Sequence, residues 1–231
     1  LLEKTTQGIS MSWALIDKAR KTVAQEDEAI IKSWGGKITV AIAYPNVYYV
    51  GMSNLGFHTI YCRLNSFPEV LCERVFLPDK DEYQEYTNTK TALFTLESQK
   101  RLYEFDIIAF SISFENDYIN ILRMLDLAKI PLERGKRDNG HPLIIAGGVV
   151  STLNPEPISN FIDLFVIGEG EEILREFIES YNSDVEEGHG KDDILERMAS
   201  ISGIYVPRCY GVRHKYRSEE HTSELQSRFD L

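Results

Sequence analysis

The chain has 231 residues, of which 43% are hydrophobic, and its formal net charge is −11. This length allows one well-buried domain with appendages, and the acidic balance argues against a general nucleic-acid binder, which needs a basic face for phosphates. The sequence contains no apolar run near the roughly 18 residues of a membrane span, and its three cysteines include no C-x-x-C pair, which argues against a disulfide framework or a zinc or iron–sulfur site in this stretch. We therefore expect a cytoplasmic protein with no membrane or nucleic-acid partner.

The first predicted element is an amphipathic helix over residues 11–33. Trp13, Ile16 and Ala19 recur at helical spacing, which predicts that they share the packed face. Gly35 and Gly36 then end the helix.

From Lys37 onward, short apolar runs alternate with longer amphipathic ones. We predict strands over residues 38–44, 70–77, 106–113, 142–146 and 164–167. We predict helices from the Ser53-Asn54 cap to about 67, over 116–130 with Ile119, Leu122 and Leu125 on one face, and from the G-E-G-E run through 181. The polar stretch 80–104 is predicted to hold one short helix at most.

Strands that alternate with helices predict an α/β fold with a parallel sheet and helices on both faces. We expect a doubly wound five-stranded parallel sheet in the flavodoxin-like, Rossmann-like order 2-1-3-4-5. The predicted division is an N-terminal helical segment (1–36), the sheet domain (37–182), and a linker that begins a connection onward (183–216). Within this last segment, we predict that the charged residues 183–192 are followed by a short helix and then by a strand or hairpin.

Residues 217–227 read RSEEHTSELQS, a polar string without apolar periodicity. The string is identical to the in-frame translation of a common sequencing adapter, so we expect residues 217–231 to be non-native. We also expect the natural sequence to continue beyond Tyr216 and to begin before Leu1.

Ligands of open α/β sheets bind at the carboxyl ends of the strands, near the point where the strand order reverses. The loops at 45–56, 111–117, 147–157 and 168–171 reach that edge in the predicted order. Their small, hydroxyl, amide and helix-initiating residues suit a polar ligand at a backbone surface. The predicted cofactor-binding residues are Pro45, Asn46, Ser53, Asn54, Leu55, Gly56, Ser111, Ser113, Glu115, Asn116, Gly147, Gly148, Gly168, Glu169, Gly170 and Glu171.

Each of these loops also has a purely structural interpretation. Ser53 or Asn54 caps a helix, the serines bond to backbone, the glycine pair makes a tight turn, and the glutamates favour a helix start. The sequence lacks G-x-G-x-x-G after the first strand, G-x-x-x-x-G-K-[ST], and G-x-S-x-G around Ser53. We therefore assign no catalytic residue and no metal ligand, and we interpret His58 as a half-buried structural residue.

Several segments, taken in order, resemble the N-terminal part of radical S-adenosylmethionine (radical SAM) proteins with a cobalamin-binding-type domain. They are YPNVYYVGMSNLGFHTIY (44–61), CERVFLPD (72–79), LFTLESQ (93–99), FDIIAFSISFENDYINIL (105–122), HPLIIAGGVVSTLNPEPISNFIDLFVIGEGEE (141–172) and GIYVPRCY (203–210). The resemblance covers residues 37–210.

This resemblance implies a downstream radical SAM barrel in the same chain as partner. That barrel would carry C-x-x-x-C-x-x-C, which ligates a 4Fe–4S cluster that binds S-adenosylmethionine. The resemblance implies cobalamin as the cofactor of the present domain. Because no histidine here stands in D-x-H-x-x-G, the cobalamin would bind without a protein histidine on cobalt.

Two alternatives remain open on the sequence. One is a degenerate Rossmann-like module that docks on the barrel without cobalamin, its cleft blocked by side chains such as Tyr48, Tyr49 or Phe114. The other is a flavin binder, which the loop PNVYYVGMSN, poor in phosphate-cradling residues, disfavours.

Overall fold

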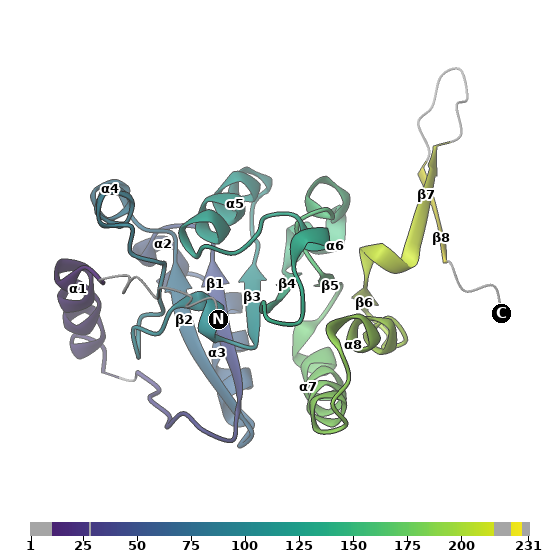
Figure 1. Ribbon diagram of the computed structural model, residues 1–231, viewed down its shortest axis with the longest axis horizontal. Helices are drawn as coiled ribbons and strands as arrows, with labels where there is room; N and C mark the ends of the chain where they lie inside the picture. Colours follow the sequence, from purple (N-terminus) through teal and green to yellow (C-terminus); the bar gives the residue numbers. More distant parts are fainter. Residues whose placement is uncertain (1–10, 28, 215–222, 228–231) are drawn as a thin grey trace, which may run out of the picture.

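A computed structural model describes residues 11–27, 29–214 and 223–227, and shows a six-stranded sheet between two layers of helices (Figure 1). The strands are β1 (Ile38–Tyr44), β2 (Val70–Phe76), β3 (Ile107–Ser111), β4 (Leu143–Gly147), β5 (Leu164–Val166) and β6 (Ile204–Tyr205). Their spatial order is β2-β1-β3-β4-β5-β6. The first five pair in parallel, and β6 pairs antiparallel to β5.

The predicted order of the five parallel strands is confirmed, and the sixth strand is a correction to the predicted sheet. A strand or hairpin is predicted for this segment, but two residues give no pattern from which their pairing with β5 could be predicted. All seven residues of β1 and of β2 are buried, as expected for strands covered on both faces.

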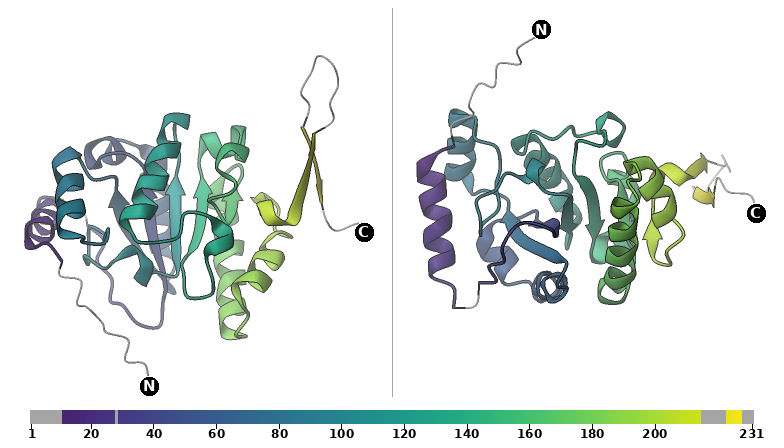
Figure 2. Two further views of the ribbon diagram at one scale, coloured as in Figure 1. Left: turned by 45° about the horizontal axis from the view of Figure 1, so that its top comes forward. Right: turned by 60° about the horizontal axis from the view of Figure 1, so that its bottom comes forward.

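Two helical layers cover the sheet. The helices are α1 (Trp13–Ala24), α2 (Tyr48–Met52), α3 (Leu55–Ser66), α4 (Lys80–Thr89), α5 (Tyr118–Leu127), α6 (Val149–Leu153), α7 (Gly170–Glu186) and α8 (Lys191–Met198). One core layer joins α3, α7 and α8 to the sheet, and the other joins α1, α4, α5 and α6 to it. Figure 2 shows α1 outside the β2 edge, far from α8 at the opposite edge.

Several predicted helix boundaries and faces are wrong. The first helix ends at Ala24 rather than at 33, and Trp13 is 75% exposed because Leu15, Ile16 and Ala19 form its packed face. In α5, Ile119 is 58% exposed, whereas Ile121, Met124 and Leu125 are buried. Helix α7 runs five residues beyond the predicted end at Tyr181 and into the predicted charged linker. The short helix predicted after that linker is confirmed as α8.

The edge strand β2 is covered by the segment that follows α4. The amide of Leu96 donates to the carbonyl of Arg74 (2.8 Å), and the amide of Arg74 donates to the Glu97 carboxylate (2.8 Å). The Arg74 guanidinium lies 2.6 Å from both Glu97 and Glu26, and its side chain is 2% exposed. These contacts occupy backbone groups that a sheet edge otherwise leaves open.

Beyond β6, β7 (Tyr210–His214) and β8 (Ser223–Ser227) form a separate two-stranded antiparallel sheet. Figure 1 shows this sheet projecting away from the body of the domain. The segment predicted to be a translated adapter lies partly outside the described residues; its described part is β8.

Candidate functional site

The carboxyl ends of the parallel strands open into a cavity of about 430 Å³ between the sheet and helices α3 and α7. We call it the switch-point cavity because it lies where β1 and β3, neighbours in space, lead their chains in opposite directions across the sheet. Its walls are apolar side chains from β1, β3, β4, β5, α3 and α7. They include Ile42, Ile60, Ala109, Ile145, Val166, Leu174, Phe177 and Ile178.

Nine of the predicted cofactor-binding residues line this cavity: Asn54, Gly56, Ser111, Ser113, Gly147, Gly148, Gly168, Glu169 and Gly170. They come from four loops that are far apart in the sequence. The structure brings them together because parallel strands end at one edge of a sheet. The rim of the cavity is therefore polar and rich in glycine, whereas its depth is apolar.

A small hydrogen-bonded cluster forms one side of the rim. The Asn54 side-chain amide donates to the hydroxyls of Ser113 (3.2 Å) and Tyr44 (3.4 Å), and the Tyr44 hydroxyl donates to Ser113 (3.3 Å). The Asn54 carbonyl oxygen accepts from the amide of Phe57, so Asn54 also caps α3. The structural interpretation of Asn54 is thus confirmed alongside its place at the rim.

Gly148 has a positive φ of 106°, and a Cβ atom there would lie 2.5 Å from the carbonyl oxygen of Ile112. No side chain fits at this point, because the obstacle is backbone rather than a movable side chain. The Gly147 carbonyl accepts from the Ile112 amide (2.8 Å), which ties the ends of β3 and β4 together. Glycine at position 148 therefore allows the loops that follow β3 and β4 to approach each other closely at the mouth of the cavity.

The remaining predicted residues do not line the cavity. The Pro45 carbonyl accepts from Asn120, Asn46 donates to Asp117, and the Ser53 hydroxyl donates to the carbonyl of Tyr49. Leu55 is 82% exposed. Glu115 and Asn116 are exposed in a 3-10 turn (Glu115–Asp117), and the side chain of Glu171 lies outside the described residues.

The side chains expected to block the cleft in a degenerate module stand elsewhere. Tyr48 donates its hydroxyl to Glu26 (2.8 Å), Tyr49 is 80% exposed and Phe114 is 57% exposed. None of the three lines the switch-point cavity. The described side chains that line it include no histidine, and His58 is half-buried with Nε2 2.9 Å from the Met52 carbonyl oxygen, as its structural interpretation predicts.

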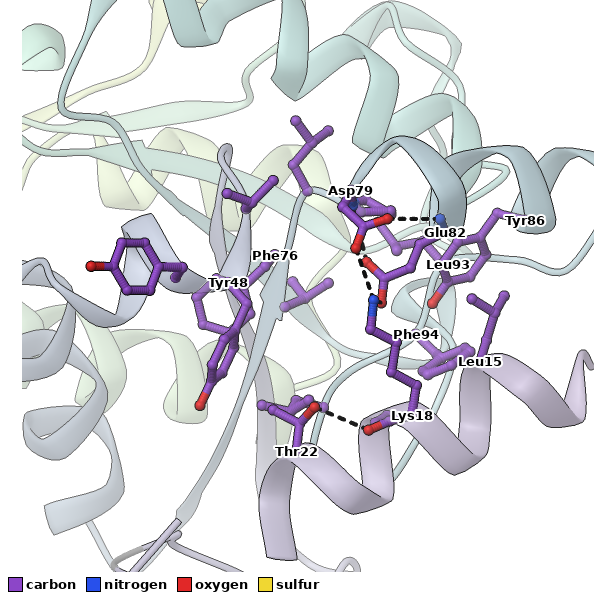
Figure 3. Close-up of a pocket in the computed structure, with 17 residues that line it drawn as sticks. Leu15, Lys18, Thr22, Tyr48, Phe76, Asp79, Glu82, Tyr86, Leu93 and Phe94 are labelled. Carbon is purple, nitrogen blue, oxygen red and sulfur yellow. Dashed lines mark hydrogen bonds and ion pairs between the residues drawn. The ribbon is translucent and has the colours of Figure 1, made fainter. Parts of the chain in front are cut away.

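A second cavity of about 390 Å³ lies between α1, α2, α4 and the end of β2 (Figure 3). The Lys18 ammonium spans its α1 side and reaches Asp79 (2.8 Å) and Glu82 (2.9 Å), which form the capping box of α4. Its walls are mainly apolar, with Leu15, Phe76 and Tyr86 among them. None of the predicted site residues lines it.

Comparison with known families decides the relationship of the chain. Residues 56–207 match the family described as "Radical SAM proteins, N-terminal". The chain belongs to this family. The family resemblance expected from the sequence is thereby shown, but the match does not extend to the cobalamin-binding type.

One curated relative of this radical SAM N-terminal domain is the "Uncharacterized protein MJ0966" of Methanocaldococcus jannaschii. It is 29% identical over 131 residues, which are 56% of this chain and 23% of the relative. The chain thus spans about a quarter of the length of that relative. No solved structure matches the chain significantly.

The apolar walls of the radical SAM N-terminal domain are the functional candidates that sequence reasoning missed. Ile42, Ala109 and Phe177 look like ordinary core residues in the sequence, and the structure buries all three, with Ile42 and Phe177 each 1% exposed, while they line the cavity. Ala109 offered one signal, because it is a small residue between Ile108 and Phe110 within the strand. Within the described residues, we find no cluster of three metal-ligating side chains and no helix with the length and apolarity of a membrane span.

Proposed function

We propose that this chain is the cofactor-binding N-terminal domain of a radical SAM enzyme and that its cofactor is of the cobalamin type. The 4Fe–4S cluster and S-adenosylmethionine would belong to a downstream barrel of the same protein, which supplies the radical chemistry. The role of the present domain is to bind and orient the cofactor. No catalytic residue is assigned to it.

The observation that carries this proposal is the shape and polarity of the switch-point cavity. A cavity of about 430 Å³ whose depth is apolar favours a flat heterocycle, such as the base of the cobalamin nucleotide tail. The corrin ring is too broad for such a space and would lie across the mouth. Ser111, Ser113 and Asn54 offer hydroxyl and amide groups to the ribose, the phosphate or the corrin amides.

The absence of histidine among the described lining residues defines the expected binding mode. Cobalt would have no protein histidine as lower ligand, and affinity would come from the buried nucleotide tail and the rim hydrogen bonds. The glycines at 147, 148, 168 and 170 support this mode, because they let a broad planar group approach the backbone closely.

Titration of the chain with hydroxocobalamin, followed by the visible spectrum of the corrin, tests the proposal. We expect saturable binding by the wild type and by Ala109→Ser, which preserves the size of the side chain. Ala109→Leu should weaken binding by at least about tenfold, since its larger side chain fills the depth of the cavity. An unchanged corrin spectrum with the wild type would end the cobalamin proposal.

A docking module without cobalamin is the second candidate, and one observation favours it. Large apolar side chains are exposed around the carboxyl edge of the sheet, and we call this set the apolar patch. It consists of Tyr49, Leu55, Phe114, Val149 and Leu153, which are 57–82% exposed. Exposed apolar groups gathered at one end of a domain are typical of a protein-binding surface.

Hydrogen exchange separates the two candidates when this chain is compared with the full-length protein. If the chain is a docking module, amide hydrogens around the apolar patch should exchange more slowly in the full-length protein than in this chain. Hydroxocobalamin should then have no effect on either sample. A cofactor-binding domain predicts that hydroxocobalamin also slows exchange at the loops that contain Ser113 and Gly148.

A further inference from the structure

A cavity of about 490 Å³ lies at the amino-terminal side of β4 and β5, away from the switch-point cavity. Its charged groups come from four separate segments: the loop before β4, the residue before β5, the first turns of α8, and the turn after β6. They are Arg134, Arg137, Asp163, Lys191, Asp192, Glu196 and Arg208. We call it the arginine cavity.

The inner part of the arginine cavity has more buried cations than carboxylates. Arg137 and Lys191 each lie 2.9 Å from Asp163, and the three side chains are 0%, 11% and 3% exposed. The Arg137 Nε atom is buried and has no hydrogen-bond partner among the described residues. One carboxylate therefore serves two buried cations, and one guanidinium donor is left without an acceptor.

Arg134 adds a third positive charge without a carboxylate of its own. Its Nη1 donates to the carbonyl of Ser159 (2.9 Å), and no described carboxylate lies within ion-pair distance of it. Burial, with further repulsion from Arg137 and Arg208, lowers the pKa of Arg134 despite the attraction of Asp163. The cation thus lies in a partly desolvated place that disfavours its charge.

Arg208 on the outer wall is already neutralised. It forms ion pairs with Asp192 and Glu196. The inner wall contains three cations, Arg134, Arg137 and Lys191, against one carboxylate, Asp163. The outer wall has one cation against two carboxylates, so the cavity as a whole has four cations and three carboxylates and an excess of one positive charge, which is concentrated on the inner wall. This local excess occurs in a chain whose formal net charge is −11.

We propose that the arginine cavity binds a small anion with phosphate or carboxylate groups. Guanidinium groups bind both kinds of oxyanion through paired, charge-assisted hydrogen bonds, and an anion here would neutralise the charge excess on the inner wall. A volume of about 490 Å³ accommodates a small metabolite. The site is independent of the switch-point cavity and of any cofactor there.

Calorimetric titration with pyrophosphate and, separately, with citrate tests this proposal and distinguishes the two anion classes. The test variant is Arg134→Gln. The matched control is Lys136→Gln, which removes the same charge from the same 3-10 turn but whose side chain is 66% exposed and pairs with Glu133. We expect one of the anions to bind the wild type and the control alike, and to bind Arg134→Gln at least about tenfold more weakly.

Arg134→Lys gives a second measurement, because it keeps the charge but loses the paired donors, so its affinity should fall between those of the wild type and Arg134→Gln. Thermal unfolding of each variant checks that it is folded. The proposal is overturned if neither anion binds the wild type, or if Lys136→Gln weakens binding as much as Arg134→Gln does.

Discussion

Asp117 is a buried carboxylate that has no cation beside it among the described residues. It lies at the carboxyl edge of the sheet and is 3% exposed. Its Oδ1 accepts from Asn46 (3.3 Å) and Asn120 (3.4 Å), whereas Oδ2 has no partner in the described structure. Burial raises the pKa of Asp117 above its ordinary value, although the two asparagine hydrogen bonds oppose the shift.

A raised pKa in the folded state means that the folded protein holds this proton more tightly than the unfolded chain does. The stabilisation is therefore fully present below the ordinary carboxyl pKa and is lost as pH rises through the folded pKa. Asp117→Asn removes the charge, so it should raise the free energy of unfolding at pH 8 by about 1 kcal/mol relative to the wild type. The difference should shrink toward pH 4, as followed by urea unfolding at each pH.

Asp126→Asn is the control for this prediction, because Asp126 is an exposed acid on α5, the helix that follows Asp117. It should leave the pH dependence of stability unchanged. The interpretation of Asp117 fails if both variants behave alike, or if Asp117→Asn destabilises the protein more at pH 8 than at pH 4.

The sequence predicted rim residues better than it predicted packed faces. Gly148 and Ser113 reach the rim because they directly follow buried parallel strands, a relation that is readable in the sequence. The exposure of Trp13 and Ile119 was not predictable in this way. The helical period identifies apolar residues on one broad face of a helix, but tertiary packing determines which of these residues are buried. The orphan oxygen of Asp117 likewise depends on neighbours distant in the sequence.

At the scale of elements, the edge strand β2 depends on a buried ion pair. Glu97 accepts from both the guanidinium and the backbone amide of Arg74, and the two side chains are each 2% exposed. Although burial opposes its charge, Glu97 and Glu26 hold the pKa of Arg74 above its ordinary value. The pair thus fixes the segment after α4 against β2.

Glu97→Ala should lower the free energy of unfolding by about 3 kcal/mol, because it leaves a buried guanidinium with a single carboxylate partner. Urea unfolding at neutral pH measures the loss. Glu104→Ala, which removes an exposed acid from the 3-10 turn that follows this segment, should cost much less. Equal costs for the two variants would contradict a structural role for the buried pair.

Element prediction succeeded where one segment alone determines the outcome. Mainly apolar runs predicted the five parallel strands, since strands covered on both faces need them, although β2 also contains Glu73 and Arg74. The polar stretch 80–104, predicted to hold one short helix at most, holds α4 over ten residues, and the Asp79-x-x-Glu82 capping box marks the start of this helix in the sequence. The Arg74–Glu97 pair could not be predicted, because it joins a strand to a loop 23 residues away.

At the scale of the whole molecule, the two sheets should differ in their contribution to stability. The β7–β8 sheet pairs only within itself in the described structure, whereas α8 adds Ile194, Leu195 and Met198 to the core. Deleting residues 217–231 should therefore change the Tm by less than about 2 °C, which corresponds to under roughly 1 kcal/mol for a chain of this size. Differential scanning calorimetry measures the change.

A chain that ends at residue 190 provides the contrast, because it also removes α8 and β6. It should unfold at a clearly lower temperature and with less cooperativity, since core residues of the α3–α7–α8 layer lose their cover. A large loss of Tm in the shorter deletion would show that the β7–β8 sheet supports the fold.

The two-residue strand β6 bears on how copies of this protein behave at high concentration. A long, flat outer strand invites a neighbouring molecule to extend the ladder, which is a common route to aggregation and fibrils. Here β6 is too short to template such growth, and the opposite boundary of the sheet has backbone groups already engaged by residues 96–97. The six-stranded sheet should consequently not be extended by intermolecular β-pairing, and contacts between folded copies at its two edges should be made by side chains.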